Sequence, residues 1–480
     1  MGACPAGSMG ACPAHTRYLL SCIDVPGLTN PIGSVERARL VRSSAADIIG
    51  EWWELQNFKS KMPEKVKLNM PEKVNMILNV LESAGYEAYV VGGCIRDNLM
   101  GKDPGDWDIA TSARPRQTKA CFPQLKTADV GIGHGTVGLI VEGEIFEVTT
   151  FRSDGRYSDL RHPDKVTFSD TIEEDLARRD FTMNAMAYGE KRGLIDIFGG
   201  RRDIENRVIR IVGRPEDRFA EDALRIFRAL RFAAETGFDI ESSTESSIYD
   251  LYGTLNLLPM ERLNAEFTGI ILGDFGEETV NRYKMIFEEV FGIRLPSKIR
   301  FSYLPKDKAL RLASLLPKND DTIASASPDD FKRLKFDNKT VREVRDIRNA
   351  SRDFDASENA VHTNKLFLKK NLRQYGESAV RKALILNEEP QDELDEIIER
   401  GECYSLKQLA VTGRDIGDMI FKEDSDGTTR LQKARPPSDP LIGKLLERLL
   451  DAVIAEKIRN ERKELLDYAQ TELSKLRKSK

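Results

Sequence analysis

The stretch EAYVVGGCIRDNLMGKDPGDWDIA, residues 87–110, decides how the rest of this chain is organised. It opens with the apolar run AYVV, which predicts a short buried strand. Gly92 and Gly93 follow directly, and a segment of helical character comes next. Two glycines between a strand and a helix expose backbone N–H groups that bind phosphate, and the helix dipole favours the same anion. Arg96, one turn into the helix, adds a guanidinium for charge-assisted bonds to that phosphate.

Two aspartates follow the phosphate-binding pattern. Asp106 and Asp108 belong to a predicted second strand over 106–109. Alternation along a strand places both carboxylates on one face, roughly 7 Å apart along the chain. Such a pair can hold two divalent cations about 3.5–4 Å apart for in-line displacement at phosphorus. Either half of the pattern alone is common, but their order and spacing indicate a nucleotidyl-transfer site with Asp106 and Asp108 as ligands of Mg²⁺.

The length and composition of the chain exclude several classes of protein. A chain of 480 residues predicts two to four domains. No apolar run approaches the ~18 residues that span a bilayer, so no membrane association is expected. The net charge of −5 requires any nucleic-acid site to be a local basic surface. The six cysteines lack C-x-x-C spacing, which favours a reducing, cytoplasmic location over disulfides or structural zinc.

Two further features of the sequence narrow its organisation. The chain has only four histidines and no His-Asp dipeptide, which excludes a metal phosphohydrolase module of the HD type. Residues 1–61 contain MGACPA twice and lack sustained periodicity. We expect them to be an extension outside the fold, either disordered or artificial in origin.

A hairpin is predicted around Glu142-Gly143, between strands over 136–141 and 144–151. Glu147 lies in the second strand. It is either a surface carboxylate or a third acidic group near the metals. The polar loop 151–163 follows, with a glycine at its centre.

The segment 171–187 predicts a helix that opens with a capping box of Thr171 and Glu174. Arg178 and Arg179 fall within it. Two arginines on a helix commonly form local salt bridges on a solvated face. Their position after the candidate metal site makes triphosphate binding the alternative.

The stretch 214–236 predicts one strong helix. Glu221, Arg225 and Arg228 share one side of it, and Asp222 lies one turn before Arg225. An ion-pair ladder is the simple interpretation. The alternative is that Asp222 accepts from an exocyclic amine while Arg225 donates to a ring acceptor. Cytosine and adenine both present that edge, whereas guanine and uracil do not.

The chain beyond residue 240 is expected to be mostly helical and charged. Helices are predicted over 259–272, 281–291, 306–316, 329–349, 363–387, 441–458 and 456–480. None of them carries a recognisable chemical constellation.

With these residues in view, the chain resembles the class II tRNA nucleotidyltransferases, the bacterial-type CCA-adding enzymes, and through them the bacterial poly(A) polymerases. The motifs are YVVGGCIRDNLMG, DWDIAT, GIGHGTVGLIV, FEVTTFR, RHPDKVTFSDTIEEDLARRDFTMNAMAY, LIDIFGGRRDI and RFAEDALRIFRALRFAAETGF. They follow in family order from about residue 86 to 238.

The resemblance implies an α+β fold: a polymerase-β-like head with a mixed sheet over 62–205, followed by a helical neck (206–270), body (271–390) and tail (391–480). It implies that Asp106 and Asp108 hold Mg²⁺, with Glu147 at an acidic position of the family. The implied nucleotide-binding residues are Gly92, Gly93, Arg96, Arg179, Asp222, Arg225, Arg228 and Arg231.

The function implied by the resemblance is template-independent addition of C, C and A to the 3′ end of tRNA, with CTP and ATP as substrates. The loop 151–163 resembles the family loop needed for the final A, which argues against an enzyme restricted to CC. A poly(A) polymerase or an A-adding relative is the alternative, because these enzymes share the head motifs.

Overall fold

The computed structural model describes residues 67–129, 131–154, 166–317, 327–356, 364–425 and 440–478. The extension 1–61 and most of the loop 151–163 lie outside these ranges, so the expectations about them stay predictions. No helix within the described ranges is long and apolar enough to cross a bilayer.

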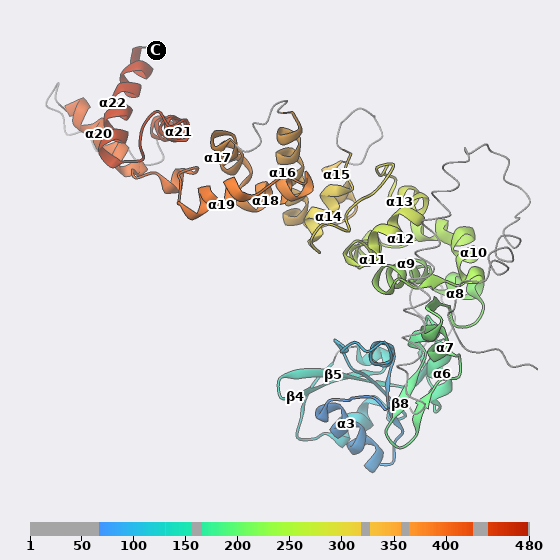
Figure 1. Ribbon diagram of the computed structural model, residues 1–480. Helices are drawn as coiled ribbons and strands as arrows, with labels where there is room; N and C mark the ends of the chain where they lie inside the picture. Colours follow the sequence, from blue (N-terminus) through green and yellow to red (C-terminus); the bar gives the residue numbers. More distant parts are fainter. Residues whose placement is uncertain are drawn as a thin grey trace, which may run out of the picture. The chain divides into compact units, whose positions relative to one another are not determined.

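The first part of the chain forms a seven-stranded mixed sheet in the order β3-β4-β5-β2-β1-β8-β9 (Figure 1). Its strands are β1 (Ala88–Val91), β2 (Asp108–Thr111), β3 (Lys126–Ala128), β4 (Thr136–Val141), β5 (Glu144–Thr150), β8 (Ala187–Gly189) and β9 (Gly193–Ile195). Only β2 and β5 pair in parallel, and the other neighbours are antiparallel. The mixed sheet expected for the head is therefore confirmed.

The central strand β1 is buried on both faces, which explains its uninterrupted apolar run. Helix α3 (Glu72–Ser83) packs against it with the buried residues Val74, Ile77, Leu78 and Leu81. On the other face, Tyr89 and Val91 share a core with Ile172 and Leu176 of α6 (Ile172–Ala177). Helix α6 thus lies on the same sheet face as Asp108, since Asp108 pairs with Val91 across the antiparallel ladder.

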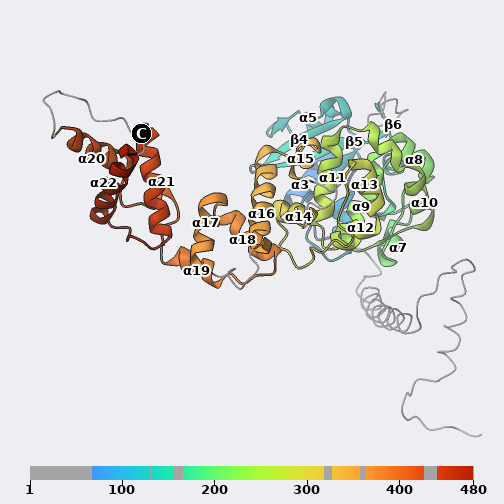
Figure 2. The same ribbon diagram turned by 90° about the horizontal axis from the view of Figure 1, so that it is seen from above.

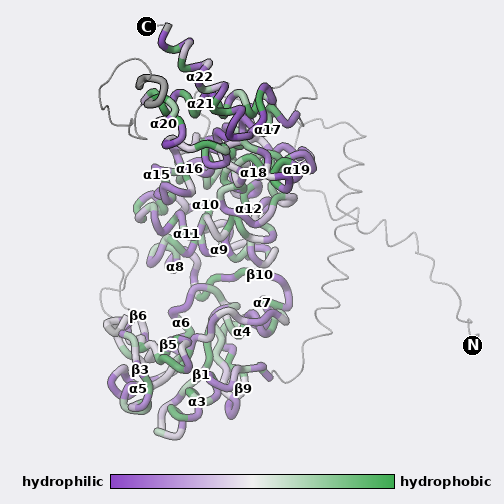
Figure 3. Tube along the Cα trace, turned by 90° about the vertical axis from the view of Figure 1, so that its left-hand side faces the viewer, coloured by the Kyte–Doolittle hydropathy of each residue, from purple (hydrophilic) through white to green (hydrophobic). Residues whose placement is uncertain are grey.

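The helices from residue 215 onward form the rest of the described chain (Figure 2). They are α8 (Pro215–Glu221), α9 (Leu224–Thr236), α10 (Ser242–Leu251), α11 (Met260–Leu272), α12 (Gly276–Arg282), α13 (Lys284–Phe291), α14 (Lys308–Ser314), α15 (Pro328–Arg333), α16 (Asn338–Ala356), α17 (Lys365–Tyr375), α18 (Glu377–Leu386), α19 (Asp392–Glu399), α20 (Gly413–Ser425), α21 (Pro440–Ile454) and α22 (Arg462–Lys478). Hydrophobic and hydrophilic residues alternate along them in Figure 3, as expected for helices with one buried face. Two short strands pair in parallel: β10 (Val208–Ile209) precedes α8, and β11 (Asp239–Ile240) lies between α9 and α10. The boundaries proposed for neck, body and tail stay predictions.

Several predicted elements differ from the structure. The strand bearing the aspartates begins at Asp108, so Asp106 lies in the preceding loop. The helix predicted over 171–187 ends at Ala177, and its Thr171 makes no side-chain capping bond. The helix predicted over 214–236 breaks at Asp222 and Ala223 into α8 and α9 because Asp222 adopts an extended backbone. The helices predicted over 281–291, 329–349 and 363–387 are likewise each divided in two.

The contact between α7 (Gly200–Glu205) and the 3₁₀ turn η2 (Thr182–Asn184) gives a test of the packing. A Cβ at Gly200 would lie 2.1 Å from the Thr182 carbonyl oxygen, whereas a Cβ at Gly253 would meet nothing within 4 Å. We expect Gly200→Ala to lower the free energy of unfolding by about 1–3 kcal/mol, because the backbone must shift. Gly253→Ala is the control, and equal urea midpoints for the two variants would contradict this packing.

Candidate active site

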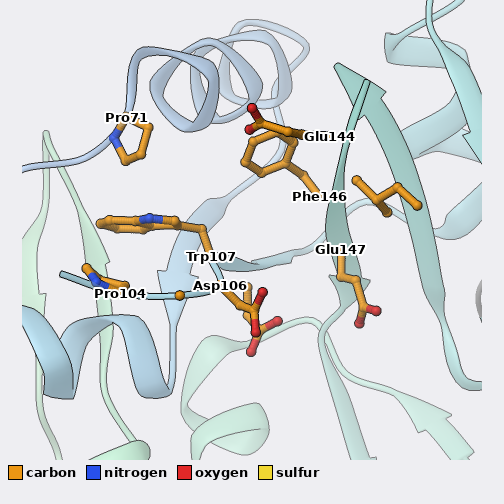
Figure 4. Close-up of a pocket in the computed structure, with 10 residues that line it drawn as sticks. Pro71, Pro104, Asp106, Trp107, Glu144, Phe146 and Glu147 are labelled. Atoms are coloured by element: carbon orange, nitrogen blue, oxygen red, sulfur yellow. The ribbon is translucent and has the colours of Figure 1, made fainter. Parts of the chain in front are cut away.

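Three acidic side chains gather at two neighbouring interior strands of the sheet, β2 and β5 (Figure 4). The parallel register pairs Ile109 with Val148, so Asp108 and Glu147 project from the same face of neighbouring strands. Asp106 precedes β2, and its carboxylate points in the same direction as that of Glu147 in Figure 4. The structure therefore brings all three acids together, although the strand does not contain Asp106.

The electrostatics of the acids reflect their closeness. The pKa of Asp108 is raised above its usual value, because partial loss of hydration and the Asp106 carboxylate outweigh the nearby Arg179. The pKa of Glu147 is also raised, first by loss of hydration and then by Asp108 and Asp106. Crowded carboxylates of this kind are stabilised by a cation.

The acids also fit the requirements of Mg²⁺. In the part of the chain that the structure describes, no three His, Cys, Asp or Glu side chains converge closely enough to hold an ion by themselves. Mg²⁺ is commonly bound by one or two carboxylates together with waters and substrate phosphates, without a cage made only of protein. The carboxylates of Asp106 and Asp108 are oxygen donors of the type that such a site needs.

The glycine turn lies directly beside these acids. Gly92 has φ +82° and its N–H donates to the Met186 carbonyl oxygen, so its conformation suits glycine. A Cβ at Gly92 would lie 2.9 Å from Arg179 Nη1 and 3.9 Å from Asp108 Oδ2. The absence of a side chain at Gly92 thus lets Arg179 approach Asp108. Gly93 begins α4 (Gly93–Leu99).

Buried Asp175 positions the two arginines that follow α6. Its carboxylate accepts from Arg178 at 2.8 Å and from Arg179 at 3.2 Å, at the i,i+3 and i,i+4 spacings. Burial raises the pKa of Asp175, but the two guanidiniums outweigh burial and leave it lowered. Local salt bridges are therefore present, as one interpretation predicted. They do not lie on a solvated face, however, because Arg179 is largely buried and its guanidinium lies close to Gly92. Asp175 was not predicted from the sequence, although its i,i+3 and i,i+4 spacing to the two arginines could have indicated these bonds.

Arg225 and Asp222 have separate partners in the structure. Arg225, 6% exposed, donates to the Arg218 carbonyl at 2.9 Å and to Glu221 at 2.8 Å. Its other nitrogen donates to the Arg178 carbonyl at 3.4 Å. Asp222 accepts from the Leu224 N–H at the start of α9. The ion-pair ladder expected between Glu221 and Arg225 thus exists, and these bonds use three of the five N–H donors of the Arg225 guanidinium.

A second network connects the phosphate-side helix α4 with α9. Arg96 donates to Asn184 Oδ1 at 2.8 Å, and Asn184 donates to Asp180 at 3.3 Å. Asp180 accepts from Arg228 Nε at 2.8 Å. Arg231, one turn along α9, lies 3.2 Å from Glu266 of α11.

The Phe232 ring makes cation–π contacts with three arginines of this region. The guanidiniums of Arg96, Arg228 and Arg231 lie 5.2, 5.4 and 5.4 Å from the centre of the Phe232 ring. Asp180, Asn184 and Phe232 were missed by the sequence reasoning. The one sequence signal for Asp180 was its position directly after Arg178 and Arg179.

Comparison with known proteins places this geometry in a family. The model of the poly A polymerase head domain matches residues 88–210. A CCA-adding enzyme from Lacticaseibacillus paracasei is 36% identical over 420 residues, which span 83% of this chain and 95% of that protein. One from Geobacillus stearothermophilus is 35% identical over 405 residues, spanning 81% and 94%. The chain belongs to the family of CCA-adding enzymes.

Solved structures of this family agree with the fold. The crystal structure of the Bacillus stearothermophilus CCA-adding enzyme in complex with CTP is 30% identical, with a TM-score of 0.68, covering 86% of this chain and all of that one. The Thermotoga maritima CCA-adding enzyme complexed with tRNA is 20% identical, with a TM-score of 0.55, covering 85% of this chain and 97% of that one, and it shares the fold. The expected family and fold class, a mixed-sheet head followed by a mostly helical region, are thus confirmed.

The Asp180–Arg228 pair predicts a pH-dependent contribution to stability. Burial raises the pKa of Asp180, but Arg228 and the hydrogen bonds to the carboxylate outweigh it and lower the pKa to about 2 from the usual 3.8. The folded state therefore favours the charged carboxylate, so its stabilisation is complete above about pH 4 and is lost as the pH falls toward 2. We expect Asp180→Asn to lower the free energy of unfolding by roughly 1–3 kcal/mol at pH 7.

Urea unfolding between pH 7 and pH 3 measures this contribution. The difference between the wild-type chain and Asp180→Asn should narrow below about pH 4. Asp239→Asn, which removes an exposed carboxylate paired with Arg282, is the control and should show little difference at any pH. A gap for Asp180→Asn that stays constant over the whole range would contradict the assignment.

Proposed function

We propose that this chain adds C, C and A to the 3′ end of tRNA without a nucleic-acid template, transferring CMP from CTP and AMP from ATP. The observation that carries the proposal is the convergence of Asp108, Gly92 and Arg179 beside the segment whose carbonyl oxygen binds Arg225. Phosphate-binding, metal-binding and base-selecting groups thereby belong to one continuous set of contacts. We place this activity in the cytoplasm, in keeping with the free cysteines Cys94, Cys121 and Cys403.

The roles of the acids follow from their positions. Asp106 and Asp108 would hold Mg²⁺, which supplies charge stabilisation to the reacting phosphate and lowers the pKa of the attacking ribose hydroxyl. Glu147, with its raised pKa, is placed to take up the proton that the hydroxyl releases as its oxygen bonds to the α-phosphorus and pyrophosphate leaves.

The basic groups would bind the triphosphate on the other side of Asp108. The backbone N–H of Gly93 at the start of α4, together with Arg96 and Arg179, would provide donors for its oxygens, and Gly92 would leave room for them because it has no side chain. Arg179 neutralises charge on the departing pyrophosphate. Asp175, through its bonds to Arg179, positions that guanidinium.

Asp222 and Arg225 would select the incoming base. Asp222 accepts from the exocyclic amine and Arg225 donates to the ring acceptor, a combination that suits cytosine and adenine. Arg228 and Arg231 continue the same helix and would fix its position through Asp180 and Glu266.

Nucleotide incorporation tests the acids. We expect Asp106→Ala to reduce CMP incorporation into tRNA by about 10³-fold or more, because metal stabilisation contributes several kcal/mol to the transition state. Asp103→Ala, an exposed acid of the same loop, is the matched control and should retain activity. Retention of full activity by Asp106→Ala would refute the metal assignment.

Single-nucleotide incorporation tests base selection. Asp222→Ala should weaken the preference for CTP and ATP over UTP and GTP by roughly 10–100-fold, because a bidentate contact is worth about 1–3 kcal/mol of discrimination. Asp217→Ala changes an exposed acid of α8 and should leave the preference unaltered. An unchanged preference in Asp222→Ala would reject the role of Asp222.

The reaction products distinguish CCA addition from the activities of related enzymes. ATP and CTP are supplied separately to tRNAs that lack CCA, CA or A, and the 3′ ends are sequenced. Successive C, C and A support the proposal. Long A tracts would indicate a poly(A) polymerase, A alone an A-adding enzyme, and binding without incorporation a non-catalytic tRNA-binding protein.

A further inference from the structure

The side chain of Arg218, on α8, is bonded to the segment that carries the proposed triphosphate-binding arginine. It is 12% exposed. Its Nη2 donates to the carbonyl oxygen of Arg178 and, at 2.7 Å, to that of Arg179. Its Nη1 donates to the Glu221 carboxylate. The backbone from which the Arg179 guanidinium extends is therefore held by a guanidinium of another helix.

The backbone of Arg218 contacts the two residues proposed to select the base. Its carbonyl oxygen accepts from the Asp222 N–H at 3.3 Å and from Arg225 Nη1 at 2.9 Å. The chain leaves α8 at Asp222, whose backbone is extended. The position of both base-selecting residues is therefore fixed against Arg218.

Arg218 and Arg225 also share two acceptors. The Glu221 carboxylate oxygen Oε2 accepts from Nη1 of each, and the Arg178 carbonyl oxygen accepts from Nη2 of each. Arg225 lies 3.4 Å from that carbonyl oxygen, and Arg218 lies closer to it. Because the two guanidiniums bond to the same oxygens, a displacement of one changes the hydrogen bonding of the other.

A cap on helix α6 is the simpler role for the Arg218 guanidinium. Arg178 directly follows α6, and a cation beside the last carbonyl oxygens of a helix is favourable. A cap explains the bonds to the carbonyl oxygens, but it does not explain the bond to Glu221, which Arg225 shares. The connection through α8 is also separate from the bond of Asp180, which joins the same segment to α9.

We propose that Arg218 is a positioning residue that couples triphosphate binding at Arg179 to base selection at Asp222 and Arg225. A triphosphate bonded to Arg179 restrains the backbone at 178–179. Arg218 passes that restraint to Glu221 and so to Arg225. The coupling presupposes the proposed function, and it makes discrimination between bases sharper when a triphosphate is bound than when it is absent.

Equilibrium binding of matched nucleotides measures this coupling without catalysis. Calorimetry with the full chain and Mg²⁺, in the absence of RNA, gives the Kd values of CTP and UTP, and those of CMP and UMP by displacement of CTP. The ratio of Kd values for UTP and CTP reports discrimination with the triphosphate, and the ratio for UMP and CMP reports it without. In the native chain we expect the first ratio to exceed the second by about 5-fold or more, the size of a typical coupling between sites.

Two substitutions test whether the coupling passes through Arg218. Lysine keeps the charge but lacks the planar fork that reaches Glu221 and the two carbonyl oxygens together, so Arg218→Lys should bring the two ratios close to each other. Glu221→Gln changes a side chain that is 34% exposed, removes the shared charge and should act in the same direction, so it decides the matter if Arg218→Lys does not fold. Arg214→Lys, at an arginine before α8 that is 78% exposed, is the matched control and should keep the native difference.

The outcomes separate the coupling from the function on which it rests. If the native chain incorporates CMP into tRNA but its two ratios are equal, the coupling is absent and the function stands. A native difference that persists in Glu221→Gln and in folded Arg218→Lys, even with all four nucleotides bound more weakly, would reduce Arg218 to a structural cap. If the native chain incorporates neither C nor A, both the function and the coupling fail.

Discussion

The bond between Asp180 and Arg228 is the interaction on which the site depends. It joins the segment after α6, which carries Arg179, to helix α9. The same segment offers its backbone carbonyls to Arg218 and Arg225. Arg228 and the hydrogen bonds to Asp180 lower the pKa of this buried carboxyl, so Asp180 is charged at neutral pH and attracts Arg228. The proposed phosphate-binding groups and the proposed base-selecting groups are consequently linked through one hydrogen-bonded network.

Within the site, the carboxylates and the guanidiniums form two separate groups. The acids lie at the interior strands β2 and β5, where loss of hydration and the neighbouring carboxylates raise the pKa of Asp108 and of Glu147. The guanidiniums lie on the other side of Asp108 and are each fixed by a neighbouring carboxylate or amide, as Arg179 is by Asp175 and Arg96 by Asn184. Groups fixed in advance need little reorganisation when charge develops on the phosphate.

The sequence was sufficient for the features that local chemistry determines. The strand, the glycine turn and the helix after it follow from apolar and glycine positions within a dozen residues, and they were predicted correctly. The break at Asp222 was missed because neither glycine nor proline marks it. The partner of Arg225 was out of reach as well, since the Arg178 carbonyl lies 47 residues earlier in the chain. Such long-range bonds depend on how α6 and α8 pack, and no local pattern encodes that.

We propose that one nucleotide is bound at its triphosphate and at its base by two sets of groups, which the Asp180–Arg228 bond connects. The most direct measurement is a crystal structure of this chain with Mg²⁺ and a non-hydrolysable CTP analogue. We expect the triphosphate at Gly93 and Arg179, the α-phosphorus facing Asp106 and Asp108, and the cytosine edge of the same molecule at Asp222 and Arg225. A cytosine bound away from Asp222 while the phosphates occupy the glycine turn would contradict it.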